Sequence, residues 1–244
     1  MAIRKVNKGD IFYPKEGGEC VVLEYENSYN VKVKFKHSGY VKKFQSSHLL
    51  RGLVSDPYYP RILGVGYLGV GKYSPKENKE AYIAWIGCLT RGYCKRYKER
   101  KPTYKDCYVC DEWHNFQNFA EWYHNHKSYG LGYHLDKDLL VKGNKVYGPD
   151  TCTMIPNHLN KLIGVNYKKD GDLPLGVTAS GKKYVARLNH RDGNMYLGIF
   201  ENADDASNAY AKAKELLVRK EAEKLKETID KRAYEALRNW KLLP

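Results

Sequence analysis

A strand–turn–strand–turn–strand–helix pattern near the C-terminus constrains the fold of this chain more than any other feature. Apolar and polar residues alternate over residues 183–188, and residues 195–200 form another short β-type run. A turn dipeptide precedes each run, Ser180-Gly181 before the first and Asp192-Gly193 before the second, and Asp-Gly favours the tight turns of hairpins. Together with an opening strand at residues 175–177, the pattern predicts a three-stranded antiparallel sheet.

A helix is predicted directly after this sheet. Asn202 is a typical N-cap residue, and Asp204 and Asp205 fall in the first turn, where negative charge is favourable against the helix dipole. The helical pattern continues or restarts towards Trp240. Small and apolar side chains recur at helical spacing and would let the helix lie close on the sheet; they are Ala206, Ala209, Tyr210, Ala213, Leu216 and Leu217.

This segment resembles the DNA-binding domain of the plant APETALA and ethylene-response-factor families, which also occurs in phage and homing-endonuclease proteins. The resemblance rests on Gly176-Val177, residues 183–188, the box at residues 196–200 and residues 203–210. It implies a sheet that enters the major groove and reads bases from its exposed face, where Arg is the commonest reader of guanine. The plant domains carry more arginines on these strands, so a different specificity is implied. The DNA contacts implied by the resemblance are Lys182, Lys183, Tyr184, Arg187, His190 and Arg191.

The charge of the whole chain favours a polyanionic partner. Its 244 residues hold 42 Lys and Arg against 28 Asp and Glu, a formal net charge of +14, together with 22 tyrosines. Neutralising phosphates releases counterions, which rewards such a composition on nucleic acid. A basic stretch at residues 91–105, interleaved with tyrosines, would track a phosphate backbone, unless it is only a solvated loop. The cations that we expect to contact DNA there are Arg91, Lys95, Arg96, Lys98, Arg100 and Lys101.

The N-terminal part of the chain has a β pattern. In residues 31–36, Val31, Val33 and Phe35 alternate with lysines, which predicts a strand with one apolar face and one lysine face in a small antiparallel barrel or curled sheet. Residues 54–77 look like a connector. Their Gly64-x-Gly66-x-x-Gly69 spacing matches a dinucleotide fingerprint, but no strong strand precedes it and no helix follows, so no organic cofactor is expected.

The central segment resembles a phage module related to HNH homing endonucleases. The resemblance implies a metal ion on the scissile phosphate, either Mg²⁺ or Mn²⁺, with Asp136 and Asn160 at the positions of two metal ligands. Lys137 stands where the family has its catalytic histidine, and Thr151 stands where it has a central Asn that braces the loop. The matching segments are residues 82–91, 110–113, 116–122, 135–138, 143–144 and 147–152, followed by Asn160.

The identity of the general base is left open by these departures. Protonated lysine is a poor base unless its pKa is strongly perturbed, so Lys137 is an unusual occupant of that position. His134 is a substitute close by in sequence, and His114, His124 and His126 are further alternatives. A histidine on an aromatic helix is also a common structural residue.

Six cysteines allow a second kind of metal site. Cys107-x-x-Cys110 has the spacing of a zinc knuckle, with Cys94 or Cys88 before it and Cys152 beyond it. Buried thiols that only pack are the alternative. A disulfide framework is not expected, because we expect a cytoplasmic protein.

These observations predict an α+β protein of three modules. They are a small β-barrel-like module at residues 1–60, a degenerate HNH-like module at 61–165, and a sheet-plus-helix DNA-binding domain with a long helix at 166–244. We expect a basic phage-type protein that binds double-stranded DNA. Its function is then that of a metal-dependent HNH-like endonuclease or, alternatively, that of a non-catalytic regulator or of an effector acting on a host protein. No apolar run is long enough to span a membrane and the first residues lack the apolar core of a signal peptide, so no membrane partner is expected. A homodimer or a complex with a host protein remains open.

Overall fold

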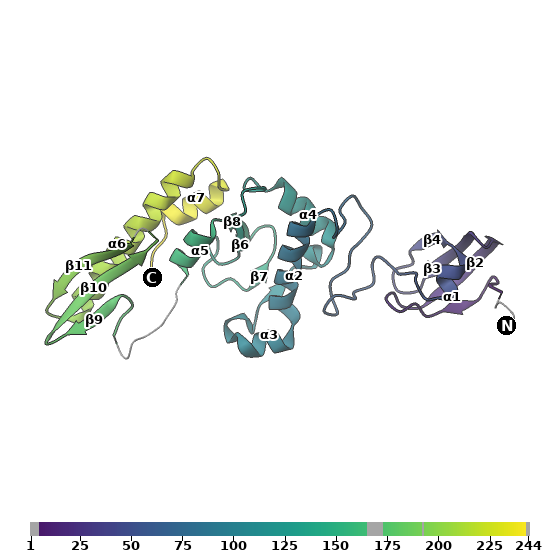
Figure 1. Cartoon of the computed structure of the whole chain (residues 1–244), viewed down its shortest axis with the longest axis horizontal. Coiled ribbons are helices and arrows are strands. Elements are labelled where there is room, and N and C mark those ends of the chain that lie inside the picture. Colours follow the sequence, from purple (N-terminus) through teal and green to yellow (C-terminus); the bar gives the residue numbers. More distant parts are fainter. Residues whose placement is uncertain (1–4, 165–172, 192, 243–244) are drawn as a thin grey trace. The chain divides into compact units, whose positions relative to one another are not determined.

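A computed structural model describes residues 5–164, 173–191 and 193–242 of the chain (Figure 1). It has the mixed α+β character that the sequence predicts. The chain divides into two compact units, Met1–His124 with Lys145–Gly148 and Asn125–Asn144 with Pro149–Pro244. This division crosses the predicted central module, because residues 125–144 belong with the C-terminal sheet and helices.

The first unit begins with an antiparallel sheet in the order β1-β2-β3-β4. Its strands are β1 (Ile11–Phe12), β2 (Cys20–Asn27), β3 (Asn30–Phe35) and β4 (Val41–Phe44), and the short helix α1 (Ser46–Leu50) follows. The period-two prediction for β3 is confirmed, since Val31, Val33 and Phe35 are fully buried while Lys34 is exposed. The apolar faces of these elements form one core.

The remainder of the first unit is built around buried aromatic side chains. Its elements are α2 (Lys79–Tyr93), α3 (Lys95–Arg100), η1 (Pro102–Tyr104), β5 (Tyr108–Val109), η2 (Asp111–His114), α4 (Phe116–Asn125) and β7 (Val146–Tyr147), with β5 and β7 parallel. Trp85, Trp113, Phe116 and Phe119 are fully buried. Burial of such large rings dominates core energetics, so these aromatics are core residues.

The second unit contains a short strand pair and a helix bundle. Strand β6 (His134–Asp136) pairs antiparallel with β8 (Thr153–Ile155), and α5 (Asn157–Ile163) follows β8 directly. The apolar side of α5 packs with α6 (Ala203–Leu225) and α7 (Lys231–Arg238) in one core. The predicted helix towards Trp240 is thus present as two helices, and Asp230 caps the second by accepting a bond from the Arg232 amide at 2.6 Å.

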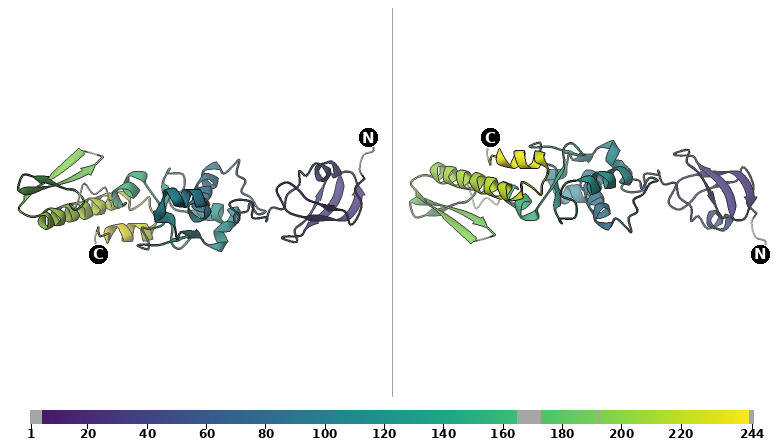
Figure 2. Two further views of the ribbon diagram at one scale, coloured as in Figure 1. Left: turned by 90° about the horizontal axis from the view of Figure 1, so that it is seen from below. Right: turned by 90° about the horizontal axis from the view of Figure 1, so that it is seen from above.

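The predicted three-stranded antiparallel sheet is present in the second unit. It consists of β9 (Val177–Ser180), β10 (Lys183–His190) and β11 (Gly193–Phe200) in the order β11-β10-β9, and Figure 2 shows α6 lying along one face of it. The predicted cap is also present, since Asn202 Oδ1 accepts a hydrogen bond from the Asp205 amide at 2.8 Å. Gly176 has a φ of +75°, and a Cβ there would overlap the ring of Tyr210, so glycine is required where α6 approaches the sheet.

Among the described residues, no helix has both the length and the apolarity that crossing a bilayer demands.

Candidate functional site

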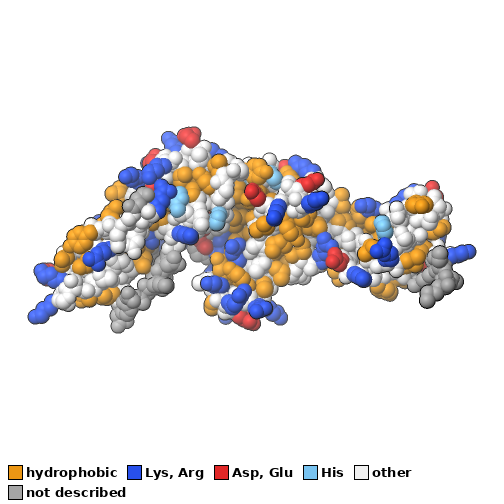
Figure 3. All heavy atoms as spheres, in the orientation of Figure 1, with side chains coloured by type: hydrophobic (Ala, Val, Ile, Leu, Met, Phe, Trp, Pro, Cys, Tyr) orange, Lys and Arg blue, Asp and Glu red, His pale blue; other side chains and the backbone are white. Residues whose placement is uncertain are grey.

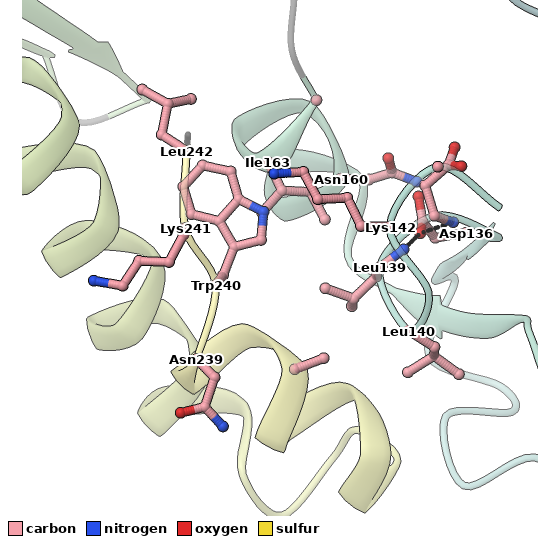
Figure 4. Close-up of a pocket in the computed structure, with 14 residues that line it drawn as sticks. Asp136, Leu139, Leu140, Lys142, Asn160, Ile163, Asn239, Trp240, Lys241 and Leu242 are labelled. Carbon is pink, nitrogen blue, oxygen red and sulfur yellow. Dashed lines mark hydrogen bonds between the residues drawn. The ribbon is translucent and has the colours of Figure 1, made fainter. Parts of the chain in front are cut away.

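The strand pair β6–β8 and the helix α5 bring two predicted site residues to one cavity. Asp136 ends β6 opposite Thr153, and Asn160 lies one turn inside α5. Both line a cavity of about 570 Å³ in the second unit. Figure 4 shows the Asp136 carboxylate and the Asn160 amide on the same side of this cavity. Residues 24 positions apart in the sequence, the two predicted metal ligands, therefore share one pocket.

The Asp136 carboxylate is held in place by the backbone that follows it. Its Oδ1 accepts hydrogen bonds from the amides of Asp138, at 2.9 Å, and Leu139, at 2.7 Å. Burial raises the pKa of Asp136, although these two hydrogen bonds act in the opposite direction. A cation beside the carboxylate would offset the cost of its burial.

The donors around the cavity suit a hard divalent cation. Besides Asp136 and Asn160, Asp138 also lines it, and its carboxylate accepts a hydrogen bond from Lys137 Nζ. Within the described residues the Asn160 side chain makes no hydrogen bond, so its amide oxygen is available as a ligand. Carboxylate and amide oxygens are the ligands that Mg²⁺ and Mn²⁺ prefer. The residues present therefore fit the ion that the HNH resemblance implies.

Lys137, at the position of the family's catalytic base, is a structural residue. Its side chain is buried, and its Nζ donates to the Asn144 carbonyl oxygen at 2.7 Å and to the Asp138 carboxylate. Asn144 Nδ2 in turn donates to the Lys137 carbonyl oxygen at 2.8 Å. These reciprocal hydrogen bonds brace the loop after β6, a task that the HNH resemblance assigns to an Asn at the position of Thr151. Lys137 is not among the residues that line the cavity, so its placement differs from that of a base.

Of the four candidate histidines, His134 lies nearest to Asp136 along the chain, although it, like Lys137, is not among the residues that line the cavity. It is exposed on β6, and side chains two residues apart on a strand point to the same face. His126 is buried: its Nδ1 accepts from the Ser128 amide at 3.1 Å, and burial lowers its pKa, which marks it as structural. His114 and His124 belong to the first unit, where they contact Tyr93 and Tyr73.

The predicted zinc ligands are not brought together. All six cysteines are free thiols, and no group of three or more His, Cys, Asp or Glu side chains in the described part of the chain is arranged to hold a metal ion. Cys94, Cys107 and Cys110 lie in the first unit, whereas Cys152 lies in the second. Burial raises the pKa of Cys110, which disfavours the thiolate that zinc requires.

The outer face of the β9–β11 sheet presents Arg187 among exposed apolar side chains. Arg187 is exposed on β10, with Tyr196 as its cross-strand partner, and Tyr196 and Ile199 are 58% and 55% exposed. Tyr184 does not join them, because it packs against the core on the helix-facing side. Lys182 and Lys183 are exposed at the β9–β10 turn, and Lys183 forms an ion pair with Glu201.

The last two predicted contacts of the sheet lie at the far end of β10. His190 and Arg191 line a second cavity, of about 430 Å³, together with His158 and Lys161 of α5. Arg191 Nη2 lies 3.4 Å from the buried Glu221 carboxylate of α6, which His158 also contacts at 3.3 Å. Glu221 of α6 therefore contacts both Arg191, at the end of β10, and His158 of α5. Arg191 thus differs from Arg187 in forming an ion pair with a buried carboxylate.

The basic stretch of the first unit is ordered around α3, and Figure 3 shows cationic side chains gathered there. Three of its six predicted DNA contacts interact with other residues of the protein, and one of them is Arg100, whose guanidinium lies 6.0 Å from the Tyr97 ring centre. The Arg91 guanidinium lies 5.9 Å from the Tyr104 ring centre, and Lys98 Nζ donates to the carbonyl oxygens of Lys105 and Cys107, at 3.0 Å each. Four of the six are exposed, namely Lys95, Arg96, Arg100 and Lys101.

Several residues of these cavities were not anticipated from the sequence. Trp240 and Lys142 line the Asp136 cavity, and His158 and Lys161 line the second one. The Gly143-Asn144 pair was part of the HNH resemblance, and this was a signal for the bracing role of Asn144. Trp240 carries no such signal, because it reaches the cavity only through the packing of the segment that follows α7.

Comparison with protein-family models, with curated proteins and with solved structures finds no match to this chain.

Proposed function

We propose that this protein binds double-stranded DNA and hydrolyses phosphodiester bonds in it with the help of a divalent metal ion. One observation carries the proposal: β6, β8 and α5 direct the carboxylate of Asp136 and the amide of Asn160 into one cavity. A strand pair followed by a helix is also the order of elements in which the HNH resemblance places its ligands. Asp136 and Asn160 would hold the ion.

The chemistry assigned to each residue follows from its position. A bound divalent ion would neutralise charge that develops on the scissile phosphate. Asp136, fixed by two backbone amides, and Asn160 keep that ion at a defined place. His134, exposed on the same face of β6, accepts the proton of the attacking water. Lys137 contributes indirectly, by bracing the loop that carries Asp138.

DNA binding is assigned to the exposed face of the β9–β11 sheet and to the cations around α3. Arg187 stands beside Tyr196 and Ile199 on a surface that α6 does not cover, and a β ribbon of this width fits the major groove. Lys95, Arg96, Arg100 and Lys101 are exposed and would contact phosphates. The net charge of +14 supports the same partner.

The test is nicking of supercoiled plasmid DNA by the full chain in Mg²⁺ or Mn²⁺. Asp136→Ala is expected to lower the rate by at least about 100-fold, as losses of a metal ligand do, and Asn160→Ala by about tenfold. Asp106→Ala is the matched control, because Asp106 is exposed and lies in the first unit. A wild-type protein that cleaves no DNA with either metal would exclude the nuclease.

A second candidate is a DNA-binding regulator without catalysis. The hydrogen bonding of Lys137 favours this non-catalytic function, because a buried, hydrogen-bonded lysine occupies the position of the family's catalytic base. The hypothesis of a non-catalytic regulator predicts salt-dependent binding of duplex DNA in EDTA and no cleavage after metal is added. Salt-independent binding would argue against phosphate contacts and hence against both candidates.

A further inference from the structure

The cavity beside Asp136 is also lined by Trp240, and metal binding gives no role to this side chain. Trp240 follows α7, and its amide donates to the Leu237 carbonyl oxygen at 3.2 Å. Figure 4 shows the indole of Trp240 on the side of the cavity opposite Asp136, with Lys142 between them. The cavity therefore has an acidic side and an aromatic side.

Trp240 is held rigidly enough to serve as a binding surface. It is half-buried and packs against the cores of α5 to α7 and of the sheet. The Nζ of Lys214, a residue only 4% exposed, lies 5.7 Å from its ring centre and 5.9 Å from that of Tyr210. A cation over an indole fixes its orientation. An aromatic ring that is already ordered loses little entropy when a ligand stacks on it.

The cations at this cavity complement an anionic ligand. Lys142 is exposed on the loop after β6, and Lys241 stands next to Trp240, where its Nζ also lies 2.6 Å from Glu215. The cavity, of about 570 Å³, is within the range of small-ligand sites. A purely apolar ligand would leave the lysines unused, and a bare phosphate would leave the indole unused. A nucleotide uses both.

We propose that this cavity binds one unpaired nucleotide of a DNA strand, with its base stacked on Trp240 and its phosphate near Lys142. The inference rests on the proposed DNA binding and specifies the form of DNA that this site accepts. A base within a duplex already has both faces covered by its neighbours, so only an extruded or single-stranded base can lie on the indole. The Asp136 side of the cavity then faces the backbone of the same strand.

The first test measures binding of fluorescein-labelled oligothymidylate to the full chain in EDTA, by fluorescence anisotropy. Trp240→Leu is expected to weaken binding about tenfold, since base–aromatic stacking contributes that much in single-strand sites. Trp240→Phe should stay within about threefold of wild type, and Lys142→Ala should weaken binding about threefold. Tyr29→Leu, which removes an aromatic ring that is 71% exposed in the first unit, is the matched control.

A second test needs no variant and is insensitive to folding defects. Oligothymidylate that carries 5-bromodeoxyuridine is irradiated with the wild-type protein, and the cross-linked peptide is identified by mass spectrometry. A cross-link at Trp240 supports the proposal. Cross-links only at other residues, or equal oligothymidylate affinity of Trp240→Leu and wild type, would overturn it.

The two proposals can fail separately. If duplex DNA binds and Trp240→Leu leaves oligothymidylate binding unchanged, the nucleotide site is wrong and the duplex-binding proposal stands. If oligothymidylate binds through Trp240 but no duplex binds, the sheet has been assigned wrongly and the nucleotide site stands.

Discussion

The second unit contains two arrangements of strands with a helix, and they present their polar residues in opposite ways. In the arrangement of β6, β8 and α5, Lys137 is buried and Asp136 accepts two backbone hydrogen bonds. In β9–β11 and α6, the sheet points Arg187 outward beside an exposed Tyr196. A buried polar group must find partners inside the fold, so its role is set by what it touches. An exposed one is free to meet a ligand.

Lys137 and Arg187 make this difference concrete, because both are cations on or next to short strands. The Lys137 ammonium bonds the Asn144 carbonyl oxygen and the Asp138 carboxylate. The Arg187 guanidinium is exposed on β10. Substitution of Lys137 should therefore lower the stability of the fold, whereas substitution of Arg187 should lower the affinity for DNA.

The largest effect is expected for Lys137→Met. The substitution removes the hydrogen bonds that Lys137 Nζ donates to the buried Asn144 carbonyl oxygen and to Asp138, so the free energy of unfolding should fall by about 2–3 kcal/mol. Chemical denaturation measures this. Lys142→Met, at an exposed position of the same loop, should change it by less than about 0.5 kcal/mol. Equal losses in the two variants would mean that Lys137 is not a brace.

Arg187→Ala should act in the opposite way. We expect duplex affinity to fall by about 2 kcal/mol, or roughly 30-fold, because a side chain that reads a base contributes on that scale. Its unfolding free energy should stay near that of wild type. Lys183→Ala is the matched control on the same strand, and its effect should be smaller because Lys183 is paired with Glu201. A loss of stability without a loss of affinity would contradict the assignment of this face to DNA.

The junction between the two arrangements should respond to pH through Glu221. Burial by itself raises the pKa of this carboxyl, but the hydrogen bond and charge of Lys224, with the charge of Arg191, outweigh it and lower the pKa. Glu221 then stabilises the fold above the unfolded-state value of about 4.3, and this contribution is lost as the pH falls through the lower folded-state pKa.

Glu221→Gln tests that contribution. At pH 7 it should lower the unfolding free energy by about 1 kcal/mol, a modest value because Arg191, Lys224 and His158 are partly exposed and screened by solvent. The gap between variant and wild type should close below about pH 4. A gap that stays constant with pH would show that the carboxylate charge is not what stabilises the junction.

The smallest effect is expected at α3. Arg96→Ala should weaken duplex binding about twofold and reduce the slope of log affinity against log salt by about one, as removal of a single phosphate contact does. Lys98→Ala, whose Nζ bonds two carbonyl oxygens, should leave the salt slope unchanged and lower stability instead. If Lys98→Ala changes the salt slope and Arg96→Ala does not, the assignment of Arg96 to phosphate binding and of Lys98 to a structural role is wrong.

Local patterns in the sequence determined much of the fold. The alternation in residues 31–36, the Ser180-Gly181 turn before β10 and the Asn202 cap all act over a few residues, and each is present as predicted. The other predicted turn dipeptide includes Asp192, which lies outside the described residues. The resemblance placed Asp136 and Asn160 as a pair, and the structure brings both to one cavity.

Only the tertiary structure decided which polar side chains remain available for a ligand. Lys137 and Asn144 brace a loop, Tyr184 faces α6, and Trp240 reaches a cavity whose other side is formed about a hundred residues earlier in the chain. The physical reason is that secondary structure depends on near neighbours and a repeating period, whereas the partners of a buried polar group are set by long-range packing. The sequence alone thus determined where strands and helices form and which residues are cationic. The packing of the second unit determined that Asp136, Asn160 and Trp240 share one cavity.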